Sequence, residues 1–251
     1  MGTGPRYPWG GLYGGQIVAQ AFWAATRSVD EGYVPHSIRA YFIRSGDHAE
    51  PVRYEVDRIR NGRSFATRRV VARQAVGAIL NAECSMQRDE GFHQIQSVTM
   101  PATAGPDATT NTSFSPHFER RWVDGTELAG QPRDGSGRTA AWMRVTDTLA
   151  DDPVVHQAWL AYISDDLPSD AVKAAYGQAY DASTEGLPGT SLDHTIWFHR
   201  PMRADRWHLH DVSCHHLFGA RGLAIGHVFD EAGLHVATVA QEVLLRTTPR
   251  A

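Results

Sequence analysis

The sequence has few cysteines and no long apolar run. Its 251 residues include two cysteines, Cys84 and Cys214, and neither has the spacing of a metal-ligand or redox motif. We therefore expect two free, buried or half-buried thiols in a reducing cytoplasm, without a disulfide framework. No stretch approaches the roughly 20 apolar residues of a membrane span. The initial segment MGTGPRYPWGG also lacks the basic and apolar parts of a secretory signal. The sequence predicts a cytoplasmic protein with no membrane partner.

An excess of one charge and a serine-hydrolase signature are also absent. The formal net charge is -4 at pH 7, which gives no electrostatic reason to expect a nucleic-acid partner. No G-x-S-x-G segment occurs, and this argues against a serine hydrolase of the α/β type. The remaining composition, with 42% hydrophobic and 21% charged residues, is typical of one large soluble domain or two small ones.

Hydrophobic periodicity predicts one helix followed by an antiparallel sheet in the first part of the chain. Over residues 14–29 apolar residues recur every three or four positions, as on the buried face of a helix. The period then changes to two in four predicted strands: HSIRAYFI, VRYEVDRI, SFATRRVV and AILNAECSM. RNGR, at 60–63, predicts a tight hairpin, because Asn and Gly tolerate positive φ.

The same order returns after a segment of different composition. Residues 95–117 are rich in Thr, Ala and Pro without periodicity, so we predict a linker. Beyond it we predict two strands (FERRWVDG and TAAWMRV), the helix DDPVVHQAWLAYISD, and four strands ending with HVATVAQEVLL. Asp152 is expected to cap that helix, with Pro153 at its first position.

Short matches at fixed offsets indicate an internal repeat. YFIR at 41–44 matches WFHR at 197–200, an offset of 197 − 41 = 156, and Gly77 matches Gly233 at the same offset. QAFWA, from Gln20, matches QAWLA, from Gln157, at 157 − 20 = 137. The smaller second offset predicts a longer connection between helix and strand in the second half. We expect an α+β fold of two repeats, each with an antiparallel sheet wrapped around a central helix.

Six motifs resemble the acyl-CoA thioesterase II family and appear in that family's order, from about Leu12 to Arg246. They are LYGGQIVAQA, PHSIRAYFIRSGD, RNGRSFATRRVVA, WLAYISD, LDHTIWFHRP and VATVAQEVLLR. The resemblance implies a double hotdog fold, with a first unit at 1–94, the linker and a second unit at 118–251. It also implies hydrolysis of acyl-CoA to a free acid and coenzyme A, with no metal, no cofactor and no covalent intermediate.

The resemblance also implies three catalytic residues. Members of this family use an Asp, a Thr or Ser, and a Gln to hold and activate the attacking water. The matching positions are Asp165, which closes LAYISD, Ser191 in SLDHT, and Gln241 in VAQEV. Many relatives have Thr at the hydroxyl position, so Ser191 keeps the hydroxyl and loses a methyl. Gln241 shares its strand parity with Val239 and Val243, which predicts that its side chain faces the core.

Five further residues are candidates for binding substrate. Gly14, Gly15 and Gln16 begin the first helix, where free N–H groups suit an oxyanion, although a simple entry turn explains them equally well. His36 heads a strand and has a pKa suited to a base, but a packing role is the plainer interpretation. Arg63, with Arg60 and Arg68 near the hairpin turn, could meet coenzyme A phosphates; exposed turn arginines need no such explanation.

The first half does not mirror the catalytic residues. By the two offsets, Asp165 corresponds to Ser28, Ser191 to Pro35 and Gln241 to Ser85, which predicts one catalytic site per chain. In addition, the first half has only a short Gly- and Pro-rich segment before its helix, so its sheet is expected to lack its first strand. An exposed sheet edge invites pairing with another chain, and we therefore predict a homo-oligomer.

Two other functions and one metal candidate were weighed. A non-catalytic acyl-CoA or acyl-carrier binding protein could use the same fold. A hotdog dehydratase would need His36 or His194 to face Asp165. HLHDVSCHH clusters four histidines (His208, His210, His215 and His216), but no carboxylate or Cys completes a metal site, and we expect a solvated strand face there.

Overall fold

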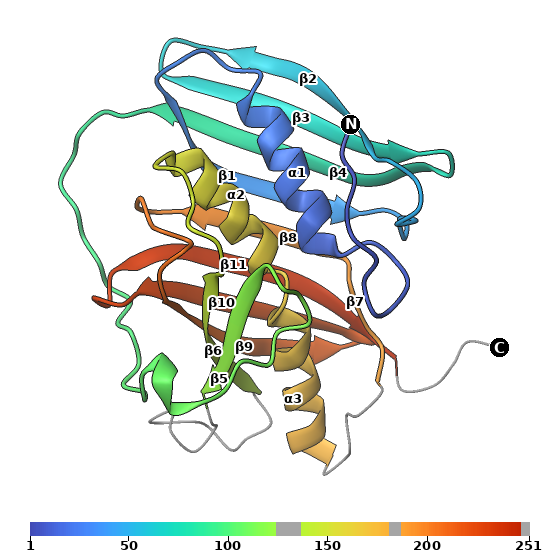
Figure 1. Cartoon of the computed structure of the whole chain (residues 1–251), viewed down its shortest axis with the longest axis vertical. Coiled ribbons are helices and arrows are strands. Elements are labelled where there is room, and N and C mark those ends of the chain that lie inside the picture. Colours follow the sequence, from blue (N-terminus) through green and yellow to red (C-terminus); the bar gives the residue numbers. More distant parts are fainter. Residues whose placement is uncertain (124–136, 181–186, 247–251) are drawn as a thin grey trace.

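One antiparallel sheet forms the frame of the molecule (Figure 1). The computed structural model describes residues 1–123, 137–180 and 187–246. Across these residues eleven strands make one sheet in the order β2-β3-β4-β1-β8-β11-β10-β9-β6-β5, with β7 paired to β11. The β1–β8 pair lies inside this order. On the β1 side the next strands are β4, β3 and β2, and on the β8 side they are β11, β10 and β9. On both sides, therefore, the last strand of the half lies next to this pair, and earlier strands follow outward.

The first half contains one helix and four strands, in the predicted order. They are α1 (Gly14–Thr26), β1 (Tyr33–Phe42), β2 (Arg53–Asn61), β3 (Phe65–Gln74) and β4 (Gly77–Arg88). The buried residues of α1 include Ile17, Val18, Ala21, Phe22 and Ala25, which are the positions that the helical periodicity predicted. The ring of Phe22 packs 5.3 Å from that of Phe198.

The second half has two strands before its helix. The elements are the short η1 (Pro106–Ala108), β5 (Phe118–Val123), β6 (Arg138–Val145), α2 (Pro153–Ile163), α3 (Pro168–Tyr180), β7 (Gly189–Ser191), β8 (Asp193–Phe198), β9 (His208–Phe218), β10 (Arg221–Asp230) and β11 (His235–Leu245). Asp152 caps α2 as predicted, because its side chain accepts a hydrogen bond from the N–H of Val154 at 2.9 Å.

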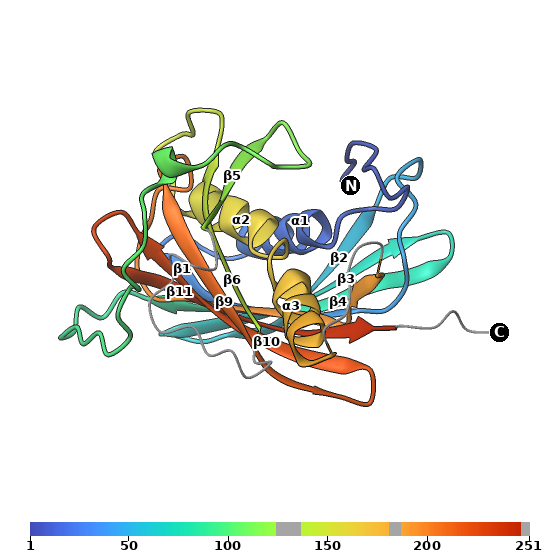
Figure 2. The same cartoon turned by 90° about the horizontal axis from the view of Figure 1, so that it is seen from below.

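The helices α1 and α2 lie side by side on one face of the sheet, and the strands curve beneath them (Figures 1 and 2). The two halves join where β1 pairs with β8, with Ile38 opposite Ile196. Both isoleucines are buried in the core. The halves are therefore connected in the sheet, by the hydrogen bonds between β1 and β8, and in the helical layer, by the packing of α1 against α2.

The helix α3 was not predicted, since the sequence indicated only a long connection there. It begins at Pro168, and its buried residues include Ala171, Val172 and Ala175. Alanine has a high helix propensity but contributes little to an apolar periodicity. The helix packs against β6, β9 and β10 and so extends the helical layer over the second half.

The explanation offered for the RNGR hairpin was wrong, although the hairpin itself exists. Neither Asn61 nor Gly62 has a positive φ; that conformation occurs instead at Gly77 and Gly233, in two other strand-to-strand turns. Glycine is needed at 62 because a Cβ there would lie 2.9 Å from the carbonyl oxygen of Phe65.

The first half has no counterpart of β5 and β6 in the part of the chain that the structure describes. Before α1, its pairing is limited to the bridges between Gly2 and Val52 and between Gly11 and Asp47. As a result β2 stands at one end of the strand order. None of the helices within the described ranges is long and apolar enough to cross a membrane.

Candidate active site

The carboxylate of Asp165 lies where the end of α2 meets the beginning of α1. The peptide N–H of Gly15 donates a hydrogen bond to Asp165 Oδ2 at 2.8 Å. N–H groups in the first turn of a helix have no partner within the helix, and the helix dipole favours negative charge beside them. The beginning of α1 therefore holds this carboxylate in place.

Glycine at the first two positions of α1 permits this approach. A Cβ on Gly15 would lie 2.1 Å from the carbonyl oxygen of Tyr162, and a Cβ on Gly14 would lie 2.6 Å from Asp165 Oδ2. A side chain at either position would thus overlap α2 or the carboxylate itself. The structure places Gly14 and Gly15 beside Asp165, and their contact with substrate stays a prediction.

Ser191 and Gln241 complete a hydrogen-bonded cluster with Asp165. Ser191 Oγ donates to Asp165 Oδ1 at 3.2 Å, and Gln241 Nε2 donates to Ser191 Oγ at 2.7 Å. Ser191 ends β7, which pairs with β11 by placing Ser191 opposite Val243, so the sheet register brings Gln241 close. The side chain of Gln241 is fully buried, as its strand parity predicted. Three distant segments therefore converge on one carboxylate.

Burial raises the pKa of Asp165 from its ordinary value of 3.8 to about 7. Loss of hydration is the largest cause, because it disfavours the charged form. Hydrogen bonds from Ser191, Gly15 and Gln241 lower the pKa and offset part of this effect, whereas the carboxylate of Asp166 raises it further. The carboxyl group of Asp165 therefore changes its protonation near neutral pH.

The neighbouring carboxylate, Asp166, belongs to a different interaction. Arg120 Nη1 donates to both of its oxygens, at 2.6 and 2.8 Å. The two side chains are 7% and 13% exposed, so this ion pair is largely buried. Tyr13 is a further titratable group near both carboxylates. Its pKa is raised mainly by burial and then by the charges of Asp165 and Asp166.

A second layer of polar side chains lies behind Gln241. His194 is fully buried, and its Nδ1 is hydrogen-bonded to Gln241 Oε1, while its Nε2 lies 2.9 Å from Ser164 Oγ. Burial lowers the pKa of His194 to about 4, so the ring is neutral. The sequence had suggested His194 only as a possible base facing Asp165. Ser164 was not identified, because no motif distinguishes a serine at the end of a helix.

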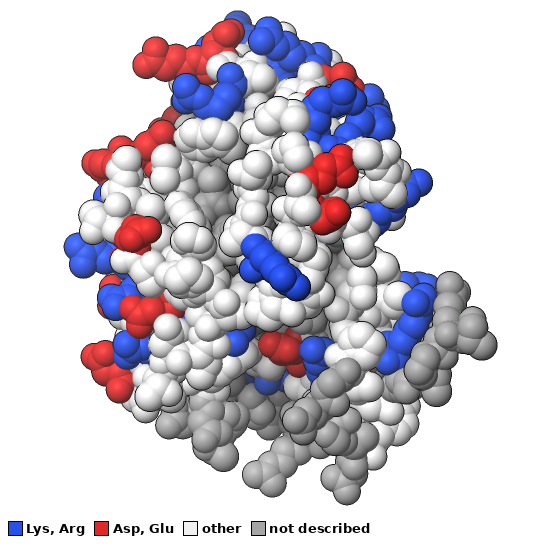
Figure 3. All heavy atoms as spheres, turned by 45° about the vertical axis from the view of Figure 1, so that its right-hand side comes forward, with Lys and Arg blue, Asp and Glu red and all other residues white. Residues whose placement is uncertain are grey.

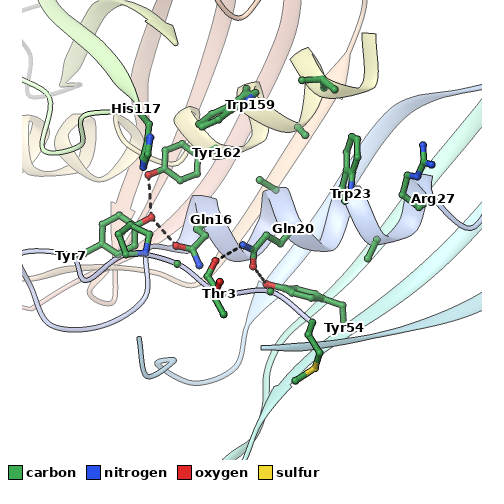
Figure 4. A pocket seen from close by; sticks show the side chains of 18 residues that line it. Thr3, Tyr7, Gln16, Gln20, Trp23, Arg27, Tyr54, His117, Trp159 and Tyr162 are labelled. Atoms are coloured by element: carbon green, nitrogen blue, oxygen red, sulfur yellow. Dashed lines mark hydrogen bonds between the residues drawn. The ribbon is translucent and has the colours of Figure 1, made fainter. Parts of the chain in front are cut away.

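A groove with a volume of about 780 Å³ lies beside this site, between the outer faces of α1 and α2 and the segment before α1 (Figure 4). Its walls include Trp23, Trp159 and Tyr162. Gln16 lies at the end of α1 nearest Asp165; its Oε1 accepts a hydrogen bond from the Tyr7 hydroxyl at 2.8 Å. Its Nε2 is buried without a partner among the described residues. Gln16 therefore faces the groove instead of the Asp165 cluster.

His36 and Arg63 do not join the Asp165 cluster. His36 is half-buried at the start of β1, and its ring packs against that of Phe65. Phe42, whose ring a Cβ on Gly14 would touch, is six residues further along β1, and six strand residues span about 20 Å. His36 therefore lies at the end of β1 that is remote from Gly14. Arg63 is exposed in the turn between β2 and β3.

Arg68 is not a surface residue, in contrast to the other turn arginines. It is 2% exposed, and its guanidinium donates to Ser28 Oγ at 2.8 Å, to the Arg60 carbonyl at 2.8 Å and to Asn61 Oδ1 at 2.6 Å. These bonds join the end of α1 to the β2–β3 hairpin. Arg68 thus fills the region of Ser28, the residue that corresponds to Asp165 in the first half.

The prediction of a solvated histidine face was wrong for His208 and His210. Both are buried, and His210 Nε2 lies 3.0 Å from His208 Nδ1. They share strand parity with the buried residues Val212 and Cys214, so this face belongs to the core. His215 and His216 are exposed. Within the described ranges, no three His, Cys, Asp or Glu side chains are arranged to hold a metal ion.

Two family models match the chain. Residues 3–87 match a model described as the acyl-CoA thioesterase N-terminal domain, and residues 96–245 match the acyl-CoA thioesterase C-terminal domain. Among curated proteins, the chain is 32% identical to acyl-CoA thioesterase 2 of Haemophilus influenzae over 94% of this chain and 87% of the relative. It is 33% identical to acyl-coenzyme A thioesterase 8 of Rattus norvegicus over 95% of this chain and 81% of the relative.

Solved structures agree with this assignment. The acyl-CoA thioesterase II TesB2 of Mycobacterium marinum is 39% identical, with a TM-score of 0.83 over 93% of this chain and 88% of that one. A protein of unknown function with a hot dog fold from Alicyclobacillus acidocaldarius is 18% identical, with a TM-score of 0.77 over 97% of this chain and 90% of that one. This second similarity supports the fold alone. The chain therefore belongs to the acyl-CoA thioesterase II family and is a thioesterase.

Proposed function

We propose that the chain hydrolyses acyl-CoA thioesters to a free acid and coenzyme A, with Asp165 as the general base. The observation that carries this proposal is a buried carboxylate with a pKa of about 7 that is held by donors from α1 and β7. A base is most effective when its pKa lies near the working pH. The named relatives are acyl-CoA thioesterases, which supports the substrate class.

In the proposed mechanism Asp165 removes a proton from a water molecule as the water oxygen attacks the thioester carbonyl carbon. The carbonyl oxygen gains negative charge, the C=O bond then re-forms as the C–S bond breaks, and the sulfur leaves with the electron pair of that bond as a thiolate. The proton held by Asp165 is then released to the thiolate or to solvent, which gives coenzyme A and restores the base. Ser191 and Gln241 orient the water or donate to the carbonyl oxygen. This route uses no metal, no cofactor and no acyl-enzyme.

The groove along α1 is our proposed place for the apolar chain of the substrate. Its aromatic walls suit an apolar ligand. The groove also begins close to Asp165, because Gln16 and Tyr162 line it. Gln16 follows Gly15, whose N–H donates to Asp165, and the Tyr162 carbonyl lies against Gly15. In this arrangement the unpartnered Nε2 of Gln16 is available to an acceptor oxygen of the substrate.

We further propose that the fold is a double hotdog made of two repeats, residues 1–94 and 118–251, joined by the linker 95–117. Support comes from the helix that precedes four antiparallel strands in each half and from the matching strand order on either side of the β1–β8 pair. We also propose one catalytic site per chain, because the residue that mirrors Asp165 is Ser28, which accepts a hydrogen bond from Arg68.

A cytoplasmic homo-oligomer is also proposed. Cys84 and Cys214 are both free and buried, which suits a reducing compartment. In the described residues, β2 pairs only with β3 along its length, whereas its counterpart β9 is covered by β6. Acidic and basic side chains are mixed over the end of the molecule formed by β2 and β3 (Figure 3), so no charge of one sign opposes pairing there.

The two alternatives have less support. A dehydratase needs a histidine that faces the acid, but His194 bonds Gln241 and Ser164, and His36 lies at the far end of β1. A binding protein would not require a buried carboxylate with three converging donors. Hydrolysis therefore accounts for more of the site than either alternative.

Replacement of Asp165 by Asn tests the proposal. We expect kcat to fall by about 10²- to 10⁴-fold, the usual contribution of a general base, for every member of an acyl-CoA length series assayed by release of free thiol. KM should vary with chain length in the unmodified protein, because longer chains bury more apolar surface in the groove.

Asp166→Asn is the matched control, since it makes the same change at the adjacent buried carboxylate. It should cost about 3–5 kcal/mol of stability by breaking the buried pair with Arg120. On the alkaline plateau of the kcat–pH profile, kcat of the folded protein should stay unchanged, because loss of the Asp166 charge lowers the pKa of Asp165 and keeps it deprotonated there. Equal kcat for both variants and the unmodified enzyme would exclude Asp165 as the base.

A further inference from the structure

His194 has no assigned part in the reaction, yet it is the fully buried link between Gln241 and the end of α2. Its Nδ1 meets Gln241 Oε1, and its Nε2 meets Ser164 Oγ. Ser164 directly precedes Asp165 in the chain. The polar chain that begins at Ser164 therefore passes through β8, β11 and β7 and returns to Asp165, the next residue along the chain.

The protonation of this chain follows from the hydrogen-bonding capacity of each group. A neutral histidine has one donor and one acceptor nitrogen. Gln241 Oε1 can only accept, so Nδ1 of His194 carries the proton and Nε2 is the acceptor. The hydroxyl of Ser164 must then donate to Nε2. With the Gln241 amide in this orientation, each group in the chain has one role.

We propose that His194 is a positioning residue that fixes the orientation of the Gln241 amide, so that an N–H of Gln241 faces Ser191. Every hydrogen bond then points toward Asp165: from Ser164 to His194, from His194 to Gln241, from Gln241 to Ser191 and from Ser191 to the carboxylate. This inference rests on the proposed function, and it specifies that Gln241 acts on the water or the substrate as a donor.

The opposite amide orientation shows why a fixed orientation matters. If Gln241 turned its Oε1 toward Ser191, the serine hydroxyl would donate to that oxygen and would no longer donate to Asp165. The carboxylate would lose one of its donors, and its pKa would rise because a bond to the charged form has been removed. The second N–H of the Gln241 amide would also point away from the water and the substrate, and could no longer donate to them.

Substitution of His194 by Leu and by Asn separates this role from simple packing. Leu cannot donate, whereas the amide nitrogen of Asn can lie near the position of Nδ1. We expect His194→Leu to lower kcat by about 10²-fold, as loss of one aligned donor does, with little change in KM. We also expect the acid limb of its kcat–pH profile to move to higher pH. His194→Asn should keep kcat within about threefold of the unmodified value.

Two more variants keep the test decisive. His210→Leu removes another buried neutral histidine, on β9, and should change stability without moving kcat or the acid limb. If His194→Leu does not fold, Ser164→Ala removes the donor to Nε2 and should move the acid limb in the same direction.

Two results would overturn the inference: equal loss of kcat in His194→Leu and His194→Asn, or an unchanged acid limb in His194→Leu and Ser164→Ala. Failure of the proposed function is a separate result, because Asp165→Asn would then retain activity whatever His194 does.

Discussion

At the scale of single residues, the site depends on how two adjacent carboxylates are stabilised. Asp165 accepts hydrogen bonds from neutral groups, and Asp166 accepts them from a guanidinium. Burial raises the pKa of both, to about 7 and about 6. Arg120 is paired with Asp166 and lowers its pKa, whereas the donors to Asp165 carry no charge, and this difference in partners distinguishes the proposed base from its neighbour.

We expect the raised pKa of Asp165, the proposed base, to set the pH dependence of the enzyme. The active base is the deprotonated form, so kcat should rise with pH through a midpoint near 7 and level off above it. Stability should change in the opposite direction, because a carboxyl whose pKa is raised on folding favours the folded state less as pH rises from about 4 to about 7. A kcat–pH profile between pH 5 and 9 measures the midpoint; a midpoint near 4 would contradict the burial argument.

At the scale of elements, the close contact between α1 and α2 depends on the absence of a side chain at Gly15. We expect Gly15→Ala to lower kcat by about 10²-fold, since a shift of about 1 Å in a reacting group has that effect. The added Cβ would lie 2.1 Å from the Tyr162 carbonyl, and backbone cannot rotate away as a side chain can. The strain should also lower stability by about 1–3 kcal/mol.

Gly11→Ala is the control for this change. A Cβ on Gly11 would meet no atom closer than 3.6 Å, so kcat and the thermal midpoint should stay near their original values. Thermal unfolding and thiol release, measured on both variants, give the comparison. Unchanged kcat in Gly15→Ala would mean that the helices can separate without disturbing Asp165.

The sequence predicted most elements because their periodicity is strong, and it missed those with weak or shared signals. Ala-rich α3 has little apolar periodicity, and His208 and His210 alternate with Trp207 and Leu209, which are buried as well. Both faces of β9 are covered in this region: Val98 and Met100 of the linker pack against the cluster that contains Leu209. Tertiary packing of a linker cannot be inferred from its composition.

The candidate site was predictable only through the family resemblance. Asp165, Ser191 and Gln241 lie 26 and 50 residues apart in the chain, and no local pattern links them. The positions of His36 and Arg63, by contrast, depend on which end of β1 lies near Asp165. A motif does not contain that information, because it follows from the pairing of β1 with β4 and β8.

At the scale of the whole molecule, the edge of β2 determines the expected assembly. Ile59 is 58% exposed on this strand, and a free edge with an exposed apolar residue favours pairing with another chain. We expect a concentration-dependent homo-oligomer in sedimentation velocity. Ile59→Lys should shift it toward monomer, because lysine on an edge strand opposes pairing, with kcat retained. A monomer at all concentrations for the unmodified chain would refute the proposed assembly.

The distribution of the site over the chain has a consequence for protein synthesis. Gly15 is made early, Asp165 and Ser191 are made later, and Gln241 lies in β11, the last strand in chain order within the described ranges. Segments fold as they emerge, amino-terminal parts first, so the first half can fold around α1 while its Gly15 N–H still lacks a partner. On the proposed mechanism, we therefore expect activity to appear only when β11 takes its place beside β7 and β8, and a nascent chain that stops before β11 to have no hydrolase activity.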